Sequence, residues 1–150
     1  MSTTLPAEWA PQTAVMLTWP REDGDFAQWF PAVERNFIEI ARAIASFEPV
    51  WINRESRPEL LRERLLRVGV RPERLKILPV PSDDVWARDH GPITVVRDGH
   101  TLHLNFIFNG WGGKFEYKRD NQITRKMAIL EPPPPLRQTE KHWWNKLWGN

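Results

Sequence analysis

Short apolar runs alternate with amphipathic segments of helical length in the first half of the chain, and this alternation constrains the fold most strongly. The apolar runs are residues 14–19, 49–52 and 75–78. Their length and the prolines beside them favour short buried strands. From Pro31 to Ile44 apolar residues recur every three or four positions, which predicts a helix. Strands and helices in alternation predict an α/β or α+β domain.

Two further helices and a hairpin complete the predicted elements. Asp98-Gly99 lies between apolar runs 93–96 and 101–107, a pattern typical of a two-residue hairpin turn. Asp120 is placed to cap a helix that Pro132 would end. The other helix is expected between residues 56 and 69. Its signals are Ser56 and Glu59 as a capping box, Leu61, Leu65 and Val68 as the apolar face, and Gly69 as the terminator. The apolar face of the first helix is predicted to comprise Val33, Phe37, Ile40, Ala41 and Ile44.

Composition narrows the class of protein. With 150 residues, 41% hydrophobic and 27% charged, the chain is expected to form one globular core. No apolar run approaches the roughly 20 residues of a membrane span, and we expect no membrane partner. Lys and Arg number 21 against 19 Asp and Glu, so no nucleic-acid partner is expected. No secretory signal pattern is visible, which favours the cytoplasm. The oligomeric state is left open.

The chain contains no cysteine. This excludes disulfides, thiolate-rich zinc sites and a cysteine nucleophile built from its own residues. Asp83, Asp84, Asp89 and His90 offer metal-ligating atoms, but their spacing matches no known metal motif. We therefore expect neither a metal nor another cofactor.

The polar segment 83–92 is the strongest candidate for a functional site. It combines three carboxylates with a Trp, an Arg and a His in a loop between predicted strands. A carboxylate and an indole together suit a planar guanidinium, and Trp86 and Asp89 lie three residues apart. The structural alternative is that one of the first two aspartates caps the turn, Arg88 pairs with Asp89, and Trp86 is packed.

A glycine-rich loop, residues 109–114, is the second notable motif. It lacks the spacing of a phosphate-binding P-loop. Its glycines are expected to let the backbone turn sharply and bring Trp111 toward a neighbour. The basic residues that follow it are interpreted as a solvated face.

Four segments in order, LPAEW at 5–9, LTWP at 17–20, DDVWARDHGP at 83–92 and FNGWGGK at 108–114, resemble the agmatine deiminase family. That family is grouped with the Porphyromonas-type peptidylarginine deiminases. The resemblance runs from about residue 5 to residue 131 and covers well under half of the family's length. It implies an α/β fold that is part of a pentein, in which ββαβ units form a propeller, with mixed sheets and flanking helices.

The activity implied by the resemblance is hydrolysis of a guanidinium group, which converts agmatine to N-carbamoylputrescine and ammonia. Asp89 matches the family's guanidinium-binding aspartate and Trp86 the Trp that lines its pocket. Asp84 and Trp111 also fall on motif positions, with Asp83 beside them as a further binding candidate. Agmatine and peptidyl-arginine both remain candidate substrates.

The family's cysteine nucleophile, His-x-Asp motif and Glu-Gly-Gly segment have no counterpart in this sequence. Residues 1–131 are therefore interpreted as the first part of a deiminase domain, inactive alone. Residues 132–150 are interpreted as a divergent Pro- and Trp-rich tail in which no helix or strand is predicted, and the chain as a truncated or frame-shifted product. A partial ring is expected to expose apolar surface. The alternative function is a non-catalytic module that binds an arginine-like ligand or a partner chain.

Overall fold

The computed structural model describes residues 2–130 and 137–138, and its centre is a parallel sheet. The three strands lie side by side in sequence order, and each crossover between them contains a helix, as the alternating pattern predicts. The strands are β2 (Val15–Thr18), β3 (Val50–Asn53) and β4 (Leu75–Leu78). The crossover helices are α1 (Phe30–Ala45) and α2 (Pro58–Arg67), accompanied by the 3-10 turns η1 (Ala27–Trp29) and η2 (Pro72–Arg74).

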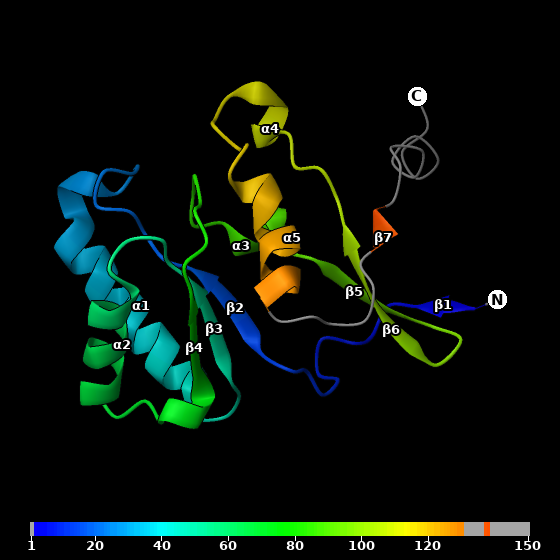
Figure 1. Cartoon of the computed structure of the whole chain (residues 1–150), viewed down its shortest axis with the longest axis horizontal. Coiled ribbons are helices and arrows are strands. Elements are labelled where there is room, and N and C mark those ends of the chain that lie inside the picture. The colour runs from blue at the N-terminus through cyan, green and yellow to red at the C-terminus, as the bar shows by residue number, and fades with distance from the viewer. Residues whose placement is uncertain (1, 131–136, 139–150) are drawn as a thin grey trace.

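The two faces of this sheet carry separate cores, because successive strand residues point to opposite sides. Ile52 of β3 packs with Ile38 of α1 and Leu65 of α2, whereas the adjacent Trp51 packs on the other side. Figure 1 shows α1 and α2 covering one face and α5 (Asp120–Leu130) on the other. The sheet is therefore the middle of three layers.

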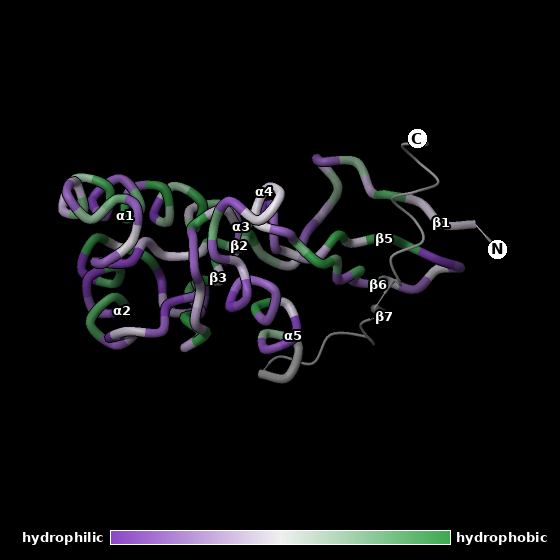
Figure 2. The backbone as a smooth tube through the Cα atoms, turned by 90° about the horizontal axis from the view of Figure 1, so that it is seen from above, coloured by the Kyte–Doolittle hydropathy of each residue, from purple (hydrophilic) through white to green (hydrophobic). Residues whose placement is uncertain are grey.

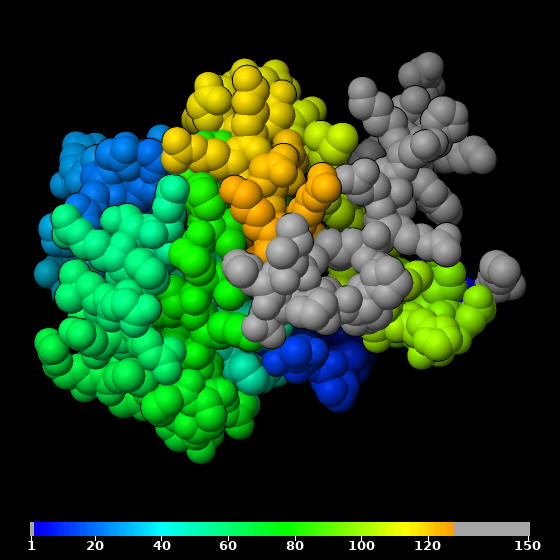
Figure 3. Space-filling view, viewed as in Figure 1, coloured from blue at the N-terminus to red at the C-terminus, as the bar shows by residue number. Residues whose placement is uncertain are grey.

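The smaller core joins the sheet to α5. Its buried residues are Leu78, Val80, Ile123 and Met127, with Met16 and Trp51 packed against them. The chain after β4 passes between the surfaces of α2 and α5 (Figure 3) and reaches the short helix α3 (Ala87–His90). This path places the polar segment 83–90 next to α5.

A second sheet is built on the predicted hairpin. Strands β5 (Ile93–Arg97) and β6 (His100–Asn105) pair around Asp98 and Gly99, whose φ angles of 48° and 80° suit a type I′ turn. Two-residue strands complete it: β1 (Thr3–Thr4) is antiparallel to β5 and β7 (Arg137–Gln138) parallel to β6. The hairpin projects away from α1 and α2 (Figure 2). The mixed-sheet α/β class is confirmed.

Several details of the expected elements are wrong. Ser56 does not cap α2: Arg57 occupies the N-cap with φ 50° and no side-chain cap bond, and the helix starts on Pro58. Ile40 is 45% exposed and Val68 40% exposed. Asp120 lies inside α5 and accepts hydrogen bonds from a different loop.

The segment after residue 131 also departs from expectation, because β7 was not predicted; the rest of the tail lies outside the described residues. Within the described residues, no helix has the length and apolar character that a bilayer crossing requires.

Candidate functional site

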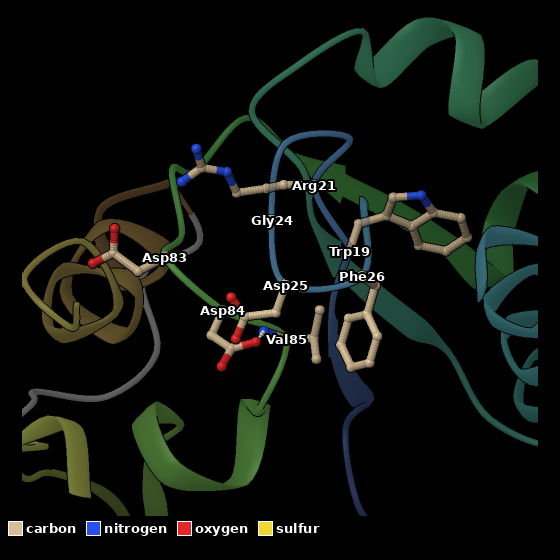
Figure 4. Close-up of a pocket in the computed structure, with 8 residues that line it drawn as sticks. All are labelled: Trp19, Arg21, Gly24, Asp25, Phe26, Asp83, Asp84 and Val85. Carbon is tan, nitrogen blue, oxygen red and sulfur yellow. Dashed lines mark hydrogen bonds between the residues drawn. The ribbon is translucent and has the colours of Figure 1, made fainter. Parts of the chain in front are cut away.

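A pocket opens where the parallel strands end, a common place for ligand sites in α/β proteins. The loop that follows β2 forms one wall and the loop that follows β4 forms the other (Figure 4). The pocket is small and open to solvent, with a cavity volume of about 10 Å³, enough for one water molecule. The lining residues are Trp19, Arg21, Gly24, Asp25, Phe26, Asp83, Asp84 and Val85.

Two carboxylates meet in this pocket. The side chains of Asp25 and Asp84 lie side by side in Figure 4, although the two residues come from different walls. Burial raises the pKa of Asp84, and the nearby charge of Asp25 raises it further. The backbone N–H of Val85 donates to Asp84 Oδ1 at 2.7 Å. A bound cation would relieve the repulsion between the two carboxylates, so the pocket favours positively charged ligands.

Two aromatic residues line the other side of the pocket. Trp19 is 2% exposed, and its Nε1–H donates to Glu34 Oε1 at 3.3 Å. Its ring packs edge-on against Phe37, with centroids 5.6 Å apart. The ring of Phe26 lies below Trp19 beside Val85 in Figure 4. The Trp19 ring therefore belongs to the core, and Phe26 is the ring that shares the pocket with the carboxylates, a combination that suits a guanidinium group.

Arg21 ties the two walls together. Its Nε and Nη2 donate to Asp23 Oδ1 and Oδ2 at 2.9 and 2.8 Å, a bidentate pair that lowers the pKa of Asp23. Its Nη1 donates to the backbone oxygen of Ser82 at 3.2 Å. The loop after β2 is thereby fixed to the loop after β4.

Asp83 and Asp84 are brought together in the pocket, but their side chains have different contacts. Asp83 Oδ2 accepts from the backbone N–H of Arg119 at 2.8 Å. In Figure 4 its carboxylate points away from the carboxylates of Asp25 and Asp84. The contacts of Asp83 therefore hold the loop, while Asp84 faces the ligand space.

Trp86 and Asp89 lie one turn further along, outside the residues that line the pocket. Trp86 is the N-cap of α3 and is 53% exposed, so the alternative in which it is packed is wrong. Asp89 is exposed, and its backbone N–H donates to the Trp86 oxygen at 2.9 Å. Arg88 lies 3.8 Å from Glu8. An indole and a carboxylate on this turn are accessible to a ligand.

Trp111 lies in a different aromatic cluster. The glycine-rich loop forms α4 (Gly110–Gly113), in which Trp111 has a left-handed φ of 51°. The ring centroid of Trp111 lies 4.9 Å from that of Phe108 and 5.5 Å from that of Phe115. The expectation that the glycines bring Trp111 to a neighbour is confirmed.

A buried polar cluster behind the pocket was not predicted. His90 Nε2 lies 3.0 Å from Thr18 Oγ1, and His90 Nδ1 lies 4.0 Å from Asp120 Oδ2. Asn53 Nδ2 donates to the same Thr18 oxygen at 3.3 Å. Burial lowers the pKa of His90 to about 4 and raises that of Asp120 to about 6. Neither His90 Nδ1 nor Asp120 Oδ2 has a hydrogen-bond partner among the described residues.

Comparison with known proteins identifies the family. The model of the Porphyromonas-type peptidyl-arginine deiminases matches residues 4–142. The chain belongs to this family. Among curated relatives, agmatine deiminase of Stutzerimonas stutzeri is 32% identical over 133 residues and that of Pseudomonas fluorescens 35% identical over 138 residues. These alignments cover 85% and 87% of this chain.

Solved deiminase structures confirm the partial pentein fold. Agmatine deiminase of Enterococcus faecalis is 25% identical with a TM-score of 0.74, and covers 92% of this chain and 38% of its own. Agmatine deiminase of C. jejuni with substrate bound superposes with a TM-score of 0.82 at 22% identity, covering 93% of this chain and 40% of its own. This deiminase-family chain spans about 35% of the length of the curated relatives it matches.

Proposed function

We propose that this chain forms the guanidinium-binding part of an agmatine-deiminase-type hydrolase, which converts agmatine to N-carbamoylputrescine and ammonia. The observation that carries the proposal is the pairing of Asp84 with Asp25 in a pocket that Phe26 also lines. Curated relatives at 32% and 35% identity are agmatine deiminases, which supports the choice of a guanidinium ligand.

The ligand chemistry follows from the shape and charge of a guanidinium group. The group is planar and cationic, donates parallel hydrogen bonds to carboxylates, and stacks on aromatic rings. We assign Asp84 and Asp25 contacts to the guanidinium group of the ligand, close to Asp89, whose charge also acts on Asp84. Asp89 is assigned a contact to the reacting guanidinium and Trp86 a stacking role, because both are exposed on one turn. Trp111 and Asp83 remain proposed binding residues.

The reaction needs a group that this chain does not contain. Resonance stabilises a guanidinium, so hydrolysis requires an activated nucleophile that adds to the central carbon. With no cysteine in the sequence, no thiolate can come from these 150 residues. We therefore propose that the chain binds substrate but needs a cysteine-bearing polypeptide for turnover, and that this takes place in the cytoplasm.

Calorimetric titration with agmatine tests the binding step. The wild-type chain is expected to bind agmatine, and Asp84→Asn and Asp89→Ala are each expected to weaken binding about tenfold, the cost of one charge-assisted hydrogen bond. Asp98→Asn in the hairpin turn is the matched control and leaves binding unchanged. Absence of agmatine binding by the wild-type chain would refute the proposal. Parallel titration with an arginine-containing peptide decides between the two substrate candidates.

The second candidate function is a non-catalytic module that binds an arginine-like ligand or partner chain, which the absence of cysteine favours. The two candidates differ in one measurement. The 150-residue chain is mixed with the cysteine-bearing remainder of a curated agmatine deiminase, and ammonia release is assayed. Release that depends on Asp89 supports the hydrolase, whereas binding without release supports the module.

A further inference from the structure

Helix α5 holds the start of the candidate loop through a buried carboxylate. Asp120 is 1% exposed, and its Oδ1 accepts from the backbone N–H of Asp83 at 2.7 Å and from that of Asp84 at 3.4 Å. The neighbouring Arg119 N–H donates in return to Asp83 Oδ2. Three hydrogen bonds therefore join the first turn of α5 to two consecutive residues of the pocket wall.

The same helix also holds the end of the candidate loop. One turn further along α5, the Thr124 hydroxyl donates to the backbone oxygen of His90 at 3.0 Å. Segment 83–90 is thus fixed at both ends by α5, and the residues assigned to the ligand lie between the two attachments. A shift of α5 would move Asp84 relative to Asp25 on the opposite wall.

Burying the Asp120 carboxylate costs free energy that burying an uncharged side chain at the same position would not cost. Burial opposes its ionisation, and the titratable groups that face it are His90 on α3 and Asp83 and Asp84 on the loop. None of these groups is a permanent cation, so within the described part of the chain no permanent ion pair offsets the loss of hydration. The benefit of the carboxylate is its acceptor strength toward the two loop amides, because ionised acceptors form the stronger hydrogen bonds.

We propose that Asp120 is a positioning residue of the guanidinium site, whose carboxylate fixes the backbone of Asp83 and Asp84 so that the Asp84 side chain faces Asp25. That the ligand is a guanidinium rests on the proposed function, whereas the effect of Asp120 on the loop does not. Asp120 acts through its neighbours and is not assigned a contact with the substrate.

Amide hydrogen exchange of the full 150-residue chain, followed by NMR, tests the effect on the loop directly. Asp120→Leu removes the acceptor and is expected to lower the protection of the Asp83 and Asp84 amides about tenfold, the equivalent of one hydrogen bond. Protection of the β3 amides on the central strand is the internal control. Unchanged protection at 83 and 84 in a folded Asp120→Leu chain would overturn the proposal.

Asp120→Asn separates positioning from packing, because it keeps the shape and an acceptor oxygen but cannot ionise. In the wild-type chain, protection of the two amides, corrected for intrinsic rates, is expected to rise severalfold as pH drops through about 6, because opening the loop hydrates the carboxyl and returns its raised pKa toward the ordinary value. Asp120→Asn is expected to show the low-pH value at every pH. Should Asp120→Leu fail to fold, a wild-type profile that does not change between pH 5 and 7.5 would still overturn the proposal.

Agmatine titration adds the functional consequence. At pH 7.5 Asp120→Leu, which lacks the acceptor, is expected to raise the dissociation constant severalfold, whereas Asp120→Asn, which keeps an acceptor oxygen, is expected to stay close to the wild-type chain. If the wild-type chain bound no agmatine, the proposed function would fail while the exchange experiment still decided the role of Asp120. If the wild-type chain bound agmatine but a folded Asp120→Leu chain bound it equally at pH 7.5, the positioning role would be refuted and the ligand retained.

Discussion

Glu34 accepts hydrogen bonds from three side chains in different parts of the chain. Its two oxygens accept from Trp19 Nε1, Arg54 Nη1 and Arg64 Nη1, at 3.3, 3.3 and 2.6 Å. Arg54 is itself 9% exposed, and Glu34 is the buried one of the two carboxylates that balance its charge within the described residues, the other being the exposed Glu22. Glu34 thereby links α1 to α2 and steadies a ring that lines the pocket.

Glu34→Ala is expected to lower the free energy of unfolding by about 3–5 kcal/mol, because it removes the buried carboxylate beside Arg54 and leaves the exposed Glu22, 3.8 Å away, to balance that charge. Urea denaturation measures the change. The control is Glu39→Ala on the same helix, whose ion pair with Arg42 is exposed and is expected to contribute less than about 1 kcal/mol. Similar losses in both variants would contradict this role for Glu34.

The coupling between the pocket carboxylates is also measurable. Asp25→Asn removes a neighbouring negative charge, so the pKa of Asp84 is expected to fall toward its ordinary value while burial keeps it raised. NMR titration of the Asp84 side chain gives the value, with Asp98→Asn as the control. No change in the Asp84 pKa would show that the two groups do not interact.

Only part of the pocket could be predicted at the residue scale. Asp83 and Asp84 were found because they lie in one dense polar segment after an apolar run. Asp25 and Trp19 lie some 60 residues earlier and reach the same space only because β2 and β4 are parallel and end at one edge of the sheet. A search for polar residues after each predicted strand would have found Asp25.

At the scale of elements, the tight turn α4 depends on one glycine more than on its neighbours. Gly110 has φ +61°, and a Cβ there would meet the backbone oxygen of Phe115 and Tyr117 Cδ1. Gly112 has φ +84° but open space around it. Both glycines have a positive φ, but only Gly112 has room for a side chain.

Gly110→Ala is therefore expected to destabilise the fold by about 1–3 kcal/mol more than Gly112→Ala, because overpacking adds to the cost of the left-handed backbone. Urea denaturation of both variants compares them. The Trp111 cluster serves as a local probe, since near-ultraviolet dichroism should change in Gly110→Ala. Equal destabilisation would mean that the turn shifts without cost.

The positions of the helices and strands in the sequence were predicted better than the sides on which they are buried. Apolar runs and the Asp98-Gly99 turn located the three parallel strands and the hairpin, because strand length and turn chemistry are local properties. The buried face of α1 differs from its apolar stripe: Glu34 is 7% exposed while Ile40 is 45% exposed. That outcome depends on Arg54 and Arg64, which belong to other parts of the chain.

For the whole molecule, the buried His90 and Asp120 act on stability in opposite directions. His90 has its pKa lowered to about 4, so its contribution is complete above about pH 6.5 and is lost as pH falls toward 4. Asp120 has its pKa raised to about 6, so its contribution is complete below about pH 4 and is lost as pH rises through 6. Between these limits the two contributions largely cancel.

Asp120→Asn removes one of the two opposing contributions. Relative to the wild-type chain, this variant is expected to lose about 3 kcal/mol of unfolding free energy as pH falls from 6.5 to 4, since about two pKa units of Asp120 shift are gone. Denaturant titrations across this range measure the difference. Parallel curves for the variant and the wild-type chain would contradict the assignment, and Asp98→Asn is expected to give such parallel curves.

The alternation of strands and helices predicted the α/β class, and the family resemblance predicted the partial pentein fold. Large apolar side chains are exposed at separate places, with Trp9 89%, Phe47 81% and Ile107 73% exposed, and the apolar surface expected of a partial ring stays a prediction. The three-layer arrangement was not predicted, because the choice of sheet face for α5 depends on the two sets of strand side chains and on contacts across the chain.

The division of the interior by the central sheet has a consequence for motion. Ile123 and Met127 attach α5 to the sheet through the smaller core, while α1 and α2 are packed on the opposite side. Detaching α5 would expose far less apolar area than complete unfolding. We therefore expect this partial opening to require less free energy than complete unfolding. Segment 83–90 would be released in that state, and ligand capture would then oppose its formation by mass action.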